Sequence, residues 1–247
     1  MQDQAKAGSC IWKERFCSVS NRKERGMFIL SPSMLSADFT MLGSQLKEVE
    51  EAGAEYLHVD VMDGLFVPSI SFGMPVIASI RKASSLVFDV HLMIREPERY
   101  IEEFVKAGAD IITFHLEATD QPEEVIRQIH SYGKKAGISI KPGTPVECIL
   151  PYLSQIDMLL MMSVEPGFGG QSYLPQSTER IRQAKRLLEE QDREIDLQVD
   201  GGISAANLAE VLEAGANVIV AGSAIFRGSI TRNIREMQQI FEKFEAS

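Results

Sequence analysis

The sequence contains little cysteine and no long apolar run. Its three cysteines (Cys10, Cys17 and Cys148) include no Cys-x-x-Cys pair, so neither a disulfide framework nor a thiolate zinc site is indicated. No apolar stretch approaches the length needed to span a bilayer, and the first residues lack the pattern of a secretory signal. These absences predict a cytoplasmic protein in a reducing compartment.

Positive charge is also scarce. The 247 residues carry 25 Lys and Arg against 35 Asp and Glu, a formal net charge of −10. Binding to nucleic acid or to an anionic membrane surface requires a basic face, so neither is expected as a partner. With 45% hydrophobic and 24% charged residues, the composition is that of a globular chain long enough for one large α/β domain.

Residues 1–26 differ from the rest of the chain. They carry six Lys and Arg against three Asp and Glu and show no clean periodicity. The segment "RKERG" can be encoded entirely by purine codons, as a ribosome-binding site is. We therefore expect an N-terminal extension over 1–26, either disordered or preceding a natural start at Met27, and a single domain over 27–247.

A repeated pattern of a helix end followed by a strand runs through that domain. The segments "EEAGAEYLHVD", "VKAGADIITFH" and "LEAGANVIVAG" share an Ala-Gly-Ala core, and "KKAGISIK" is a looser copy. Gly53, Gly108 and Gly215, with Gly137 in the looser copy, stand where a helix ends in a left-handed residue before a β-branched run. The pattern predicts strands near 28–32, 55–60, 86–92, 110–115, 137–141, 157–162, 195–200 and 217–221.

Amphipathic segments with apolar residues at three- and four-residue spacing separate these strands, for example 41–53 and 177–191. Eight alternations of strand and helix in a single domain predict an α/β fold of the (β/α)₈ or TIM-barrel type. A doubly wound open sheet is the structural alternative, although no G-x-G-x-x-G follows the first strand.

Polar residues gather at the predicted carboxyl ends of the strands, where active sites of such barrels lie. His58 and Asp60 share one face of their strand because side chains alternate with period two. With His91 and Asp200 from other strands, they make a candidate site for one divalent cation, and the mixed nitrogen and oxygen ligands suit zinc, iron(II), manganese or cobalt. His130 lies within a helical pattern and is expected at the surface.

Small residues follow the sixth, seventh and eighth strands, in "PGFGG" (166–170), "DGGIS" (200–204) and "AGSAIF" (221–226). Backbone amides in these loops can approach a phosphate closely, and the first loop is flexible enough to act as a lid. These segments contain no arginine, so we expect amides to hold the phosphate. Met62, Met93 and Met162 lie near strand ends and are expected to form an apolar wall that excludes water.

Several motifs in order along the chain resemble the ribulose-phosphate 3-epimerase family. They are "SPSMLSADF", "HVDVMDGLFVP", "FDVHLMI", "FHLEA", "VEPGFGGQ", "VDGG" and "AGSAIF", and the resemblance covers about residues 28–245. It implies an isomerase of the pentose phosphate pathway that interconverts D-ribulose 5-phosphate and D-xylulose 5-phosphate. It also implies a divalent metal on the four residues proposed above, and a homo-oligomer.

The resemblance further implies a catalytic role for two of these ligands. Asp60 and Asp200 would be the acid and base, acting at C3 through a metal-stabilised enediolate. Substrate contacts would be made by Ser33, His91, Met62, Met93, Met162, Gly167, Gly169, Gly170, Gly201, Gly202, Gly222 and Ser223.

Three positions depart from the family's usual residues, namely Leu65, Ser69 and Glu165, and all lie in loops that would shape the sugar pocket. A related epimerase acting on D-allulose 6-phosphate is therefore the nearest alternative. A metal-dependent hydrolase would use similar strand-end residues, but the phosphate loops and paired acids favour the epimerase. A non-catalytic sugar-phosphate sensor would not need both aspartates.

Overall fold

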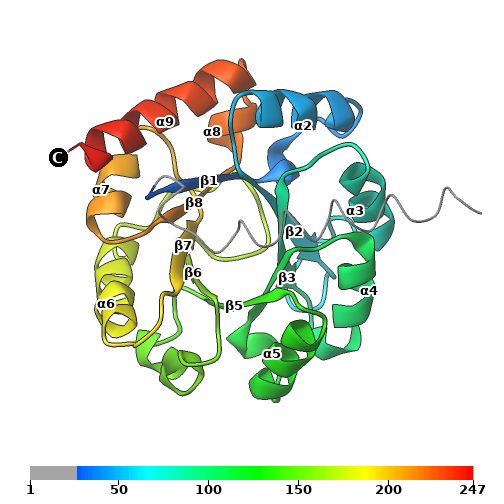
Figure 1. The fold of residues 1–247 in the computed structure, drawn as a ribbon, viewed down its shortest axis with the longest axis vertical. Coiled ribbons are helices and arrows are strands. Elements are labelled where there is room, and N and C mark those ends of the chain that lie inside the picture. Colours follow the sequence, from blue (N-terminus) through cyan, green and yellow to red (C-terminus); the bar gives the residue numbers. More distant parts are fainter. Residues whose placement is uncertain (1–26, 247) are drawn as a thin grey trace, which may run out of the picture.

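The computed structural model describes residues 27–246, which form one (β/α)₈ barrel (Figure 1). Eight parallel strands pair in the order β1-β8-β7-β6-β5-β4-β3-β2, and a bridge between Ser33 and His58 joins the two ends of the sheet. The expected barrel is confirmed and the open-sheet alternative is wrong. The strands are β1 (Ile29–Pro32), β2 (Tyr56–Met62), β3 (Val87–Met93), β4 (Ile111–His115), β5 (Lys135–Ile140), β6 (Met158–Met162), β7 (Asp196–Asp200) and β8 (Val218–Ala221).

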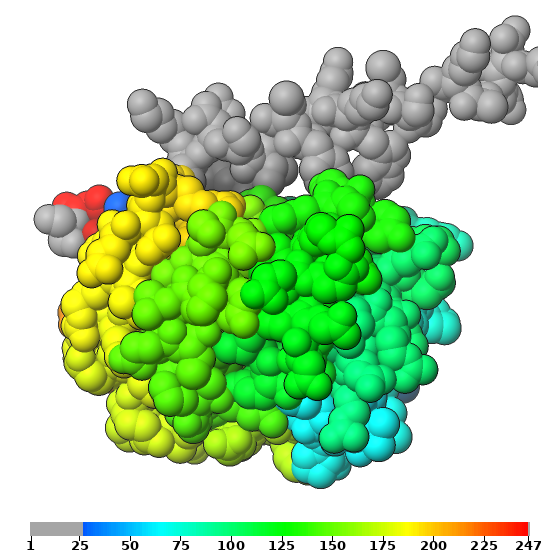
Figure 2. Space-filling model, turned by 90° about the horizontal axis from the view of Figure 1, so that it is seen from below, coloured from blue at the N-terminus to red at the C-terminus, as the bar shows by residue number. Residues whose placement is uncertain are grey.

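Helices surround the strands (Figure 1). They are α2 (Leu42–Glu51), α3 (Met74–Arg81), α4 (Ile101–Ala107), α5 (Pro122–Ser131), α6 (Ser177–Glu189), α7 (Leu208–Glu213), α8 (Ser223–Phe226) and α9 (Ile230–Glu245). Short 3₁₀ turns occur at η3 (Met34–Ser36), η4 (Pro97–Arg99), η5 (Leu116–Ala118) and η6 (Val146–Tyr152). The chain passes around the barrel in sequence order, and Figure 2 shows its green-to-yellow segments as one continuous outer wall.

Three of the four glycines in the repeated pattern end helices as expected. Gly53, Gly108 and Gly215 have φ values of +93°, +112° and +111°. The prediction for Gly137 is wrong, because this residue lies inside β5 and Gly133, with φ +69°, makes the turn instead. A Cβ on Gly137 would meet Thr113 Oγ1 at 2.3 Å, so the barrel interior requires a glycine there.

The two faces of each strand differ in polarity. Outward residues such as Leu57, Val59 and Val61 pack in the main apolar core with the helices. Ile29, Tyr56, Ile111, Met158 and Val218, each the first residue of its strand, form an apolar cluster of their own. Further along the barrel strands, the buried residues include Ser31 of β1, His58 of β2, Asp89 of β3 and Gln198 of β7. The barrel therefore begins with an apolar cluster and becomes polar toward the carboxyl ends of its strands.

The remaining expectations concern the N-terminal extension, membrane-spanning helices and the position of His130. The extension proposed for 1–26 lies outside the described residues. Among residues 27–246, no helix is both long enough and apolar enough to cross a membrane. His130 lies on α5 with a side chain that is 40% exposed, as expected for a surface residue.

Candidate active site

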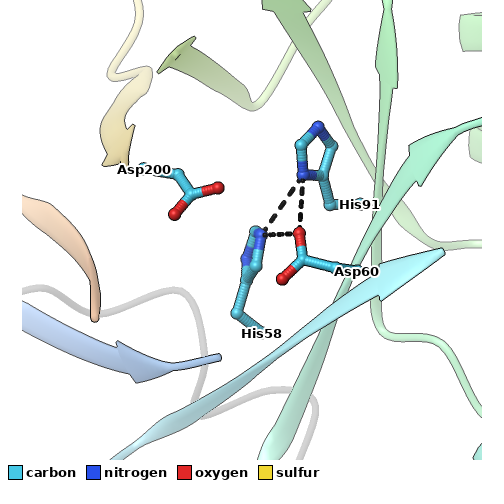
Figure 3. A group of neighbouring side chains, drawn as sticks. All are labelled: His58, Asp60, His91 and Asp200. Atoms are coloured by element: carbon cyan, nitrogen blue, oxygen red, sulfur yellow. Dashed lines mark hydrogen bonds and ion pairs between the residues drawn. The ribbon is translucent and has the colours of Figure 1, made fainter. Parts of the chain in front are cut away.

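The four predicted ligand residues lie together at the carboxyl ends of β2, β3 and β7 (Figure 3). One donor atom from each of His58, Asp60, His91 and Asp200 lies within 4.8 Å of the other three. Asp60 Oδ1 is 3.1 Å from His91 Nδ1 and 3.3 Å from His58 Nε2, and the two ring nitrogens are 3.4 Å apart. Asp200 faces this group from the opposite side. The result is a compact set of two nitrogens and two carboxylates.

Both carboxylate oxygens of Asp60 have partners, Oδ1 the two histidines and Oδ2 a serine. Its Oδ2 accepts a hydrogen bond of 2.6 Å from the hydroxyl of Ser33, which follows β1 directly. Ser33 also forms the bridge to His58 that joins β1 and β2. The closure of the barrel and the orientation of this carboxylate are therefore set by the same residue.

Behind His58 lies a buried acid that the sequence analysis did not single out. Asp89 of β3 is fully buried, and its Oδ2 is 2.7 Å from His58 Nδ1. The same oxygen accepts hydrogen bonds from Ser31 and Gln198. Because a carboxylate can only accept, His58 Nδ1 carries the proton and Nε2 is directed at Asp60 and His91. Asp89 stands two residues before His91 on the same strand face, so period-two alternation was the signal that could have found it.

Behind His91 lies a longer arrangement on β4 and η5. His91 Nε2 is 3.0 Å from His115 Nε2, and His115 Nδ1 is 3.2 Å from Glu117 Oε2. The sequence analysis assigned no role to either His115 or Glu117. Both belong to the "FHLEA" motif.

The environment separates the pKa values of the two aspartates. Burial alone would raise the pKa of Asp60, but the charge and hydrogen bond of His58 outweigh it and hold that pKa well below its ordinary value. Burial, together with the charge of Asp60, raises the pKa of Asp200 to about 7. Burial would lower the pKa of His58, but Asp60 and Asp89 raise it well above the ordinary value. Such a separation of two carboxylates is typical of acid/base sites.

A cavity of about 400 Å³ opens above these residues. Asp60 and Asp200 line it, whereas His58 and His91 are fully buried and do not. Of the expected substrate contacts, only His91 is absent from the lining. The others that line it are Ser33, Met62, Met93, Met162, Gly167, Gly169, Gly170, Gly201, Gly202, Gly222 and Ser223. Leu65, Ser69 and Glu165 do not line this cavity, although Ser69 borders a neighbouring one.

The loops after β6 and β7 pack tightly over one another at the cavity. Gly202 has φ +67°, and a Cβ there would lie 2.2 Å from Tyr173 N and 2.8 Å from Gln171 O. Both contacts are with backbone, so they cannot be relieved by turning a side chain. This close approach fixes the segment 171–173 against the loop that carries Asp200.

One cationic side chain lines the cavity, and the sequence analysis did not anticipate it. Arg227 follows α8, one residue beyond the "AGSAIF" segment, and an η nitrogen of its guanidinium lies 3.8 Å from the Cβ position of Gly170. Within residues 27–246, the only other charged side chains in the lining are Asp60 and Asp200. The cavity thus has an acidic floor and a mouth lined by glycines and one arginine.

Fold and site together define a barrel enzyme with a two-histidine, two-carboxylate centre at the carboxyl ends of its strands. The family model described as "Ribulose-phosphate 3 epimerase family" matches residues 29–226. The chain belongs to the ribulose-phosphate 3-epimerase family.

Several curated proteins that are similar to this chain are named as ribulose-phosphate 3-epimerases. The ribulose-phosphate 3-epimerase of Synechocystis sp. is 48% identical over 200 residues, which are 80% of this chain and 87% of that protein. That of Bacillus subtilis is 44% identical over 201 residues, or 81% of this chain and 93% of that protein. The chloroplastic ribulose-5-phosphate-3-epimerase of Arabidopsis thaliana is 46% identical, with 83% of this chain and 74% of that protein covered.

More distant solved structures share the barrel. A 3-hexulose-6-phosphate synthase from Salmonella typhimurium has a TM-score of 0.67 at 17% identity, covering 87% of this chain and 99% of that one. A 3-keto-L-gulonate-6-phosphate decarboxylase from Vibrio cholerae has a TM-score of 0.68 at 12% identity, covering 88% and 98%. At these identities the likeness shows the fold alone.

Proposed function

We propose that this protein interconverts D-ribulose 5-phosphate and D-xylulose 5-phosphate by inverting C3, with Asp60 and Asp200 as the acid and base. The observation that carries the proposal is the pair of carboxylates from β2 and β7 at the floor of one cavity. Inversion beside a ketone requires removal of the C3 proton on one face and its return on the other. Two carboxylates from different strands meet that requirement.

The different pKa values of Asp60 and Asp200 indicate which carboxyl group is ionised before the reaction begins. Asp60, whose pKa is lowered, is ionised and suited to remove a proton, whereas Asp200, with a pKa of about 7, can hold one to return. In the reverse direction the roles exchange. Met62, Met93 and Met162 line the same cavity and would keep water from the reacting carbon.

The donor set fits a divalent cation, with His58, Asp60, His91 and Asp200 as its ligands. Ligand distances near 2.1 Å require donors no more than about 4.2 Å apart, so the group would contract by a few tenths of an ångström around the ion. A bound cation would polarise the ketone and stabilise the negative charge that develops on the C2 oxygen. Zinc, iron(II), manganese and cobalt all suit this mixture of imidazole and carboxylate.

Metal binding should become stronger as the pH rises. His58, with a raised pKa, must lose a proton before it can bind a cation, and Asp200, with a pKa of about 7, binds one more strongly once its proton is lost. Below pH 7, apparent affinity should therefore fall by about tenfold per pH unit for each proton displaced. Calorimetry in two buffers of different ionisation enthalpy should find one to two protons released per zinc at pH 6 and fewer at pH 8.5. No release at pH 6 would contradict this assignment.

Arg227 should strengthen binding of the phosphate, in addition to the backbone amides that are expected to hold it. Its guanidinium has no ion-pair partner among residues 27–246 and lies at the glycine-lined mouth. A charge-assisted hydrogen bond contributes about 1.5–3 kcal/mol, so Arg227→Ala should raise KM about tenfold or more with kcat nearly unchanged. Arg235→Ala, on the exposed side of α9, removes the same charge and should leave KM unaltered. Equal KM values for the two variants would exclude this role.

Three further proposals concern substrate and surroundings. The six-carbon D-allulose 6-phosphate is the second candidate substrate, because Leu65 and Ser69 differ from the family's usual residues and Ser69 borders the neighbouring cavity. A homo-oligomer remains a prediction that sedimentation can test. A cytoplasmic location is also a prediction, since the name of one relative places that protein in the chloroplast.

The direct test is proton NMR of D-ribulose 5-phosphate with the metal-loaded protein in D₂O. We expect xylulose 5-phosphate to appear together with deuterium at C3. If neither appears although metal is bound, the same experiment with D-allulose 6-phosphate distinguishes the six-carbon alternative from a wrong reaction class. Turnover of neither ketose would favour the metal-dependent hydrolase.

A further inference from the structure

The buried arrangement behind His91 has a defined hydrogen-bond direction. Glu117 accepts hydrogen bonds at Oε1 from the Lys141 amide, at 2.8 Å, and from the Thr144 hydroxyl. Its other oxygen, Oε2, is 3.2 Å from His115 Nδ1. Since an ionised carboxylate only accepts, His115 must carry its proton on Nδ1. Burial would raise the pKa of Glu117, but the hydrogen bonds from His115 and Thr144 lower it to about 2, so Glu117 is ionised.

The next contact determines the proton position on His91. The two Nε2 atoms of His91 and His115 are 3.0 Å apart, so only one of them can carry a proton in a hydrogen bond. If His115 carried it, that fully buried ring would be a cation, and His91 would turn a protonated Nδ1 toward Asp60. A cationic ring with no contact to water is costly at this fully buried position, so the neutral ring is favoured. His91 therefore holds its proton on Nε2 and leaves Nδ1 with a lone pair.

We infer that His115 and Glu117 are positioning residues that fix the tautomer of His91 and so make its Nδ1 available to the cation of the proposed metal centre. This inference rests on the proposed function, because it requires the centre to bind a cation. Asp89 has the corresponding role for His58 in a single step, since it accepts from Nδ1 and so directs Nε2 at Asp60 and His91. Ligand histidines commonly donate their second nitrogen in this way, and loss of the partner typically costs about 10- to 100-fold in metal affinity.

The ring of His115 is also held by packing. The Phe66 ring lies against it at 4.9 Å between centroids, and Lys141 Nζ lies 4.0 Å from the Phe66 ring centroid. Lys141 and Thr144 belong to the loop after β5, so Glu117 connects that loop to the histidines of β3 and β4. A phenylalanine keeps an aromatic ring at this position while removing the hydrogen bonds of His115.

The test compares zinc affinity, measured by chelator competition, in the full-length wild type and three variants. His115→Phe should weaken zinc binding about 10- to 100-fold. Glu117→Ala, which leaves His115 Nδ1 without its acceptor, should also weaken it, and Glu117→Gln should restore most of the affinity because its amide oxygen still accepts. The matched control is His130→Phe, which removes a histidine hydrogen-bonded to Asp157 on the outer surface and should bind zinc as the wild type does.

A second measurement separates positioning from general destabilisation. Long-range proton–nitrogen NMR of the metal-free wild type should show His91 protonated on Nε2, and Glu117→Ala should populate the Nδ1 form. A purely structural role would lower the melting temperature but leave both the tautomer and the zinc affinity unchanged, and that result would overturn the inference. Zinc affinity within twofold of wild type in both His115→Phe and Glu117→Ala would overturn it too. Failure of the wild type to bind zinc, iron(II), manganese or cobalt would instead reject the metal centre, and the inference with it.

Discussion

Replacing either Asp60 or Asp200 with asparagine should abolish epimerisation while leaving the barrel folded. Each positioned acid or base contributes roughly 10² to 10⁴ in rate, and asparagine keeps the shape but cannot exchange a proton. The kcat of each purified variant, measured with saturating metal, should fall by at least that factor. Asp192→Asn, at an exposed position before β7, is the matched control and should keep full activity.

The two variants should also differ in which epimer still exchanges its C3 proton with the solvent. With Asp200 replaced, Asp60 can still remove and return a proton on its own face, so one epimer should take up deuterium at C3 without conversion. With Asp60 replaced, any remaining exchange should occur in the other epimer. Full turnover in one variant would remove that residue from the catalytic pair, and exchange in the same epimer for both would contradict the assignment of opposite faces.

Gly202→Ala should cause the second large effect, because it affects the loop contact next to Asp200. A residue other than glycine at φ +67° is strained by roughly 1–2 kcal/mol, and the added Cβ would collide with backbone atoms of Gln171 and Tyr173. Displacing reacting groups by about 1 Å can cost about 10²-fold, so we expect kcat/KM to fall by that order together with a lower melting temperature.

Gly43→Ala provides the comparison for this prediction. Gly43 lies in α2, no atom lies within 4 Å of its Cβ position, and alanine favours a helix by about 1 kcal/mol over glycine. That variant should melt slightly higher and keep its activity. If Gly202→Ala behaved like Gly43→Ala, the backbone approach of residues 171–173 would have no functional importance.

The strand pattern of the chain carried enough information to predict the barrel. Every predicted strand bound lies within two residues of the observed one. Short β-branched runs after left-handed glycines leave little freedom in where a parallel strand begins. The error at Gly137 arose because two glycines stand near one turn, and only the packing against Thr113 shows which of them lies in the strand.

The residues of the candidate metal centre could be predicted from the sequence, but the buried residues behind them could not. His58 and Asp60 alternate on one strand, so their common face could be deduced from the sequence. Asp89 and Glu117 contact other residues rather than the cavity. Asp89 is bonded to residues of β1, β2 and β7, and Glu117 to the loop after β5, and a single sequence does not show which of these segments meet. Arg227 stands just beyond a motif of small residues, and its place at the mouth depends on the turn after α8.

The position of Asp200 at the end of β7, late in the chain, makes the order of chain synthesis relevant to cation binding at this site. The four candidate ligands come from β2, β3 and β7. Strands β2 and β3 pair directly with each other, whereas β7 faces them across the closed barrel. A nascent chain that has not yet released residue 200 from the ribosome lacks the fourth ligand and the strands that complete the barrel. Tight binding of a cation at these four residues would therefore follow translation of nearly the whole domain. Because the ion then binds the native state and not the unfolded chain, it would stabilise the entire barrel rather than one loop.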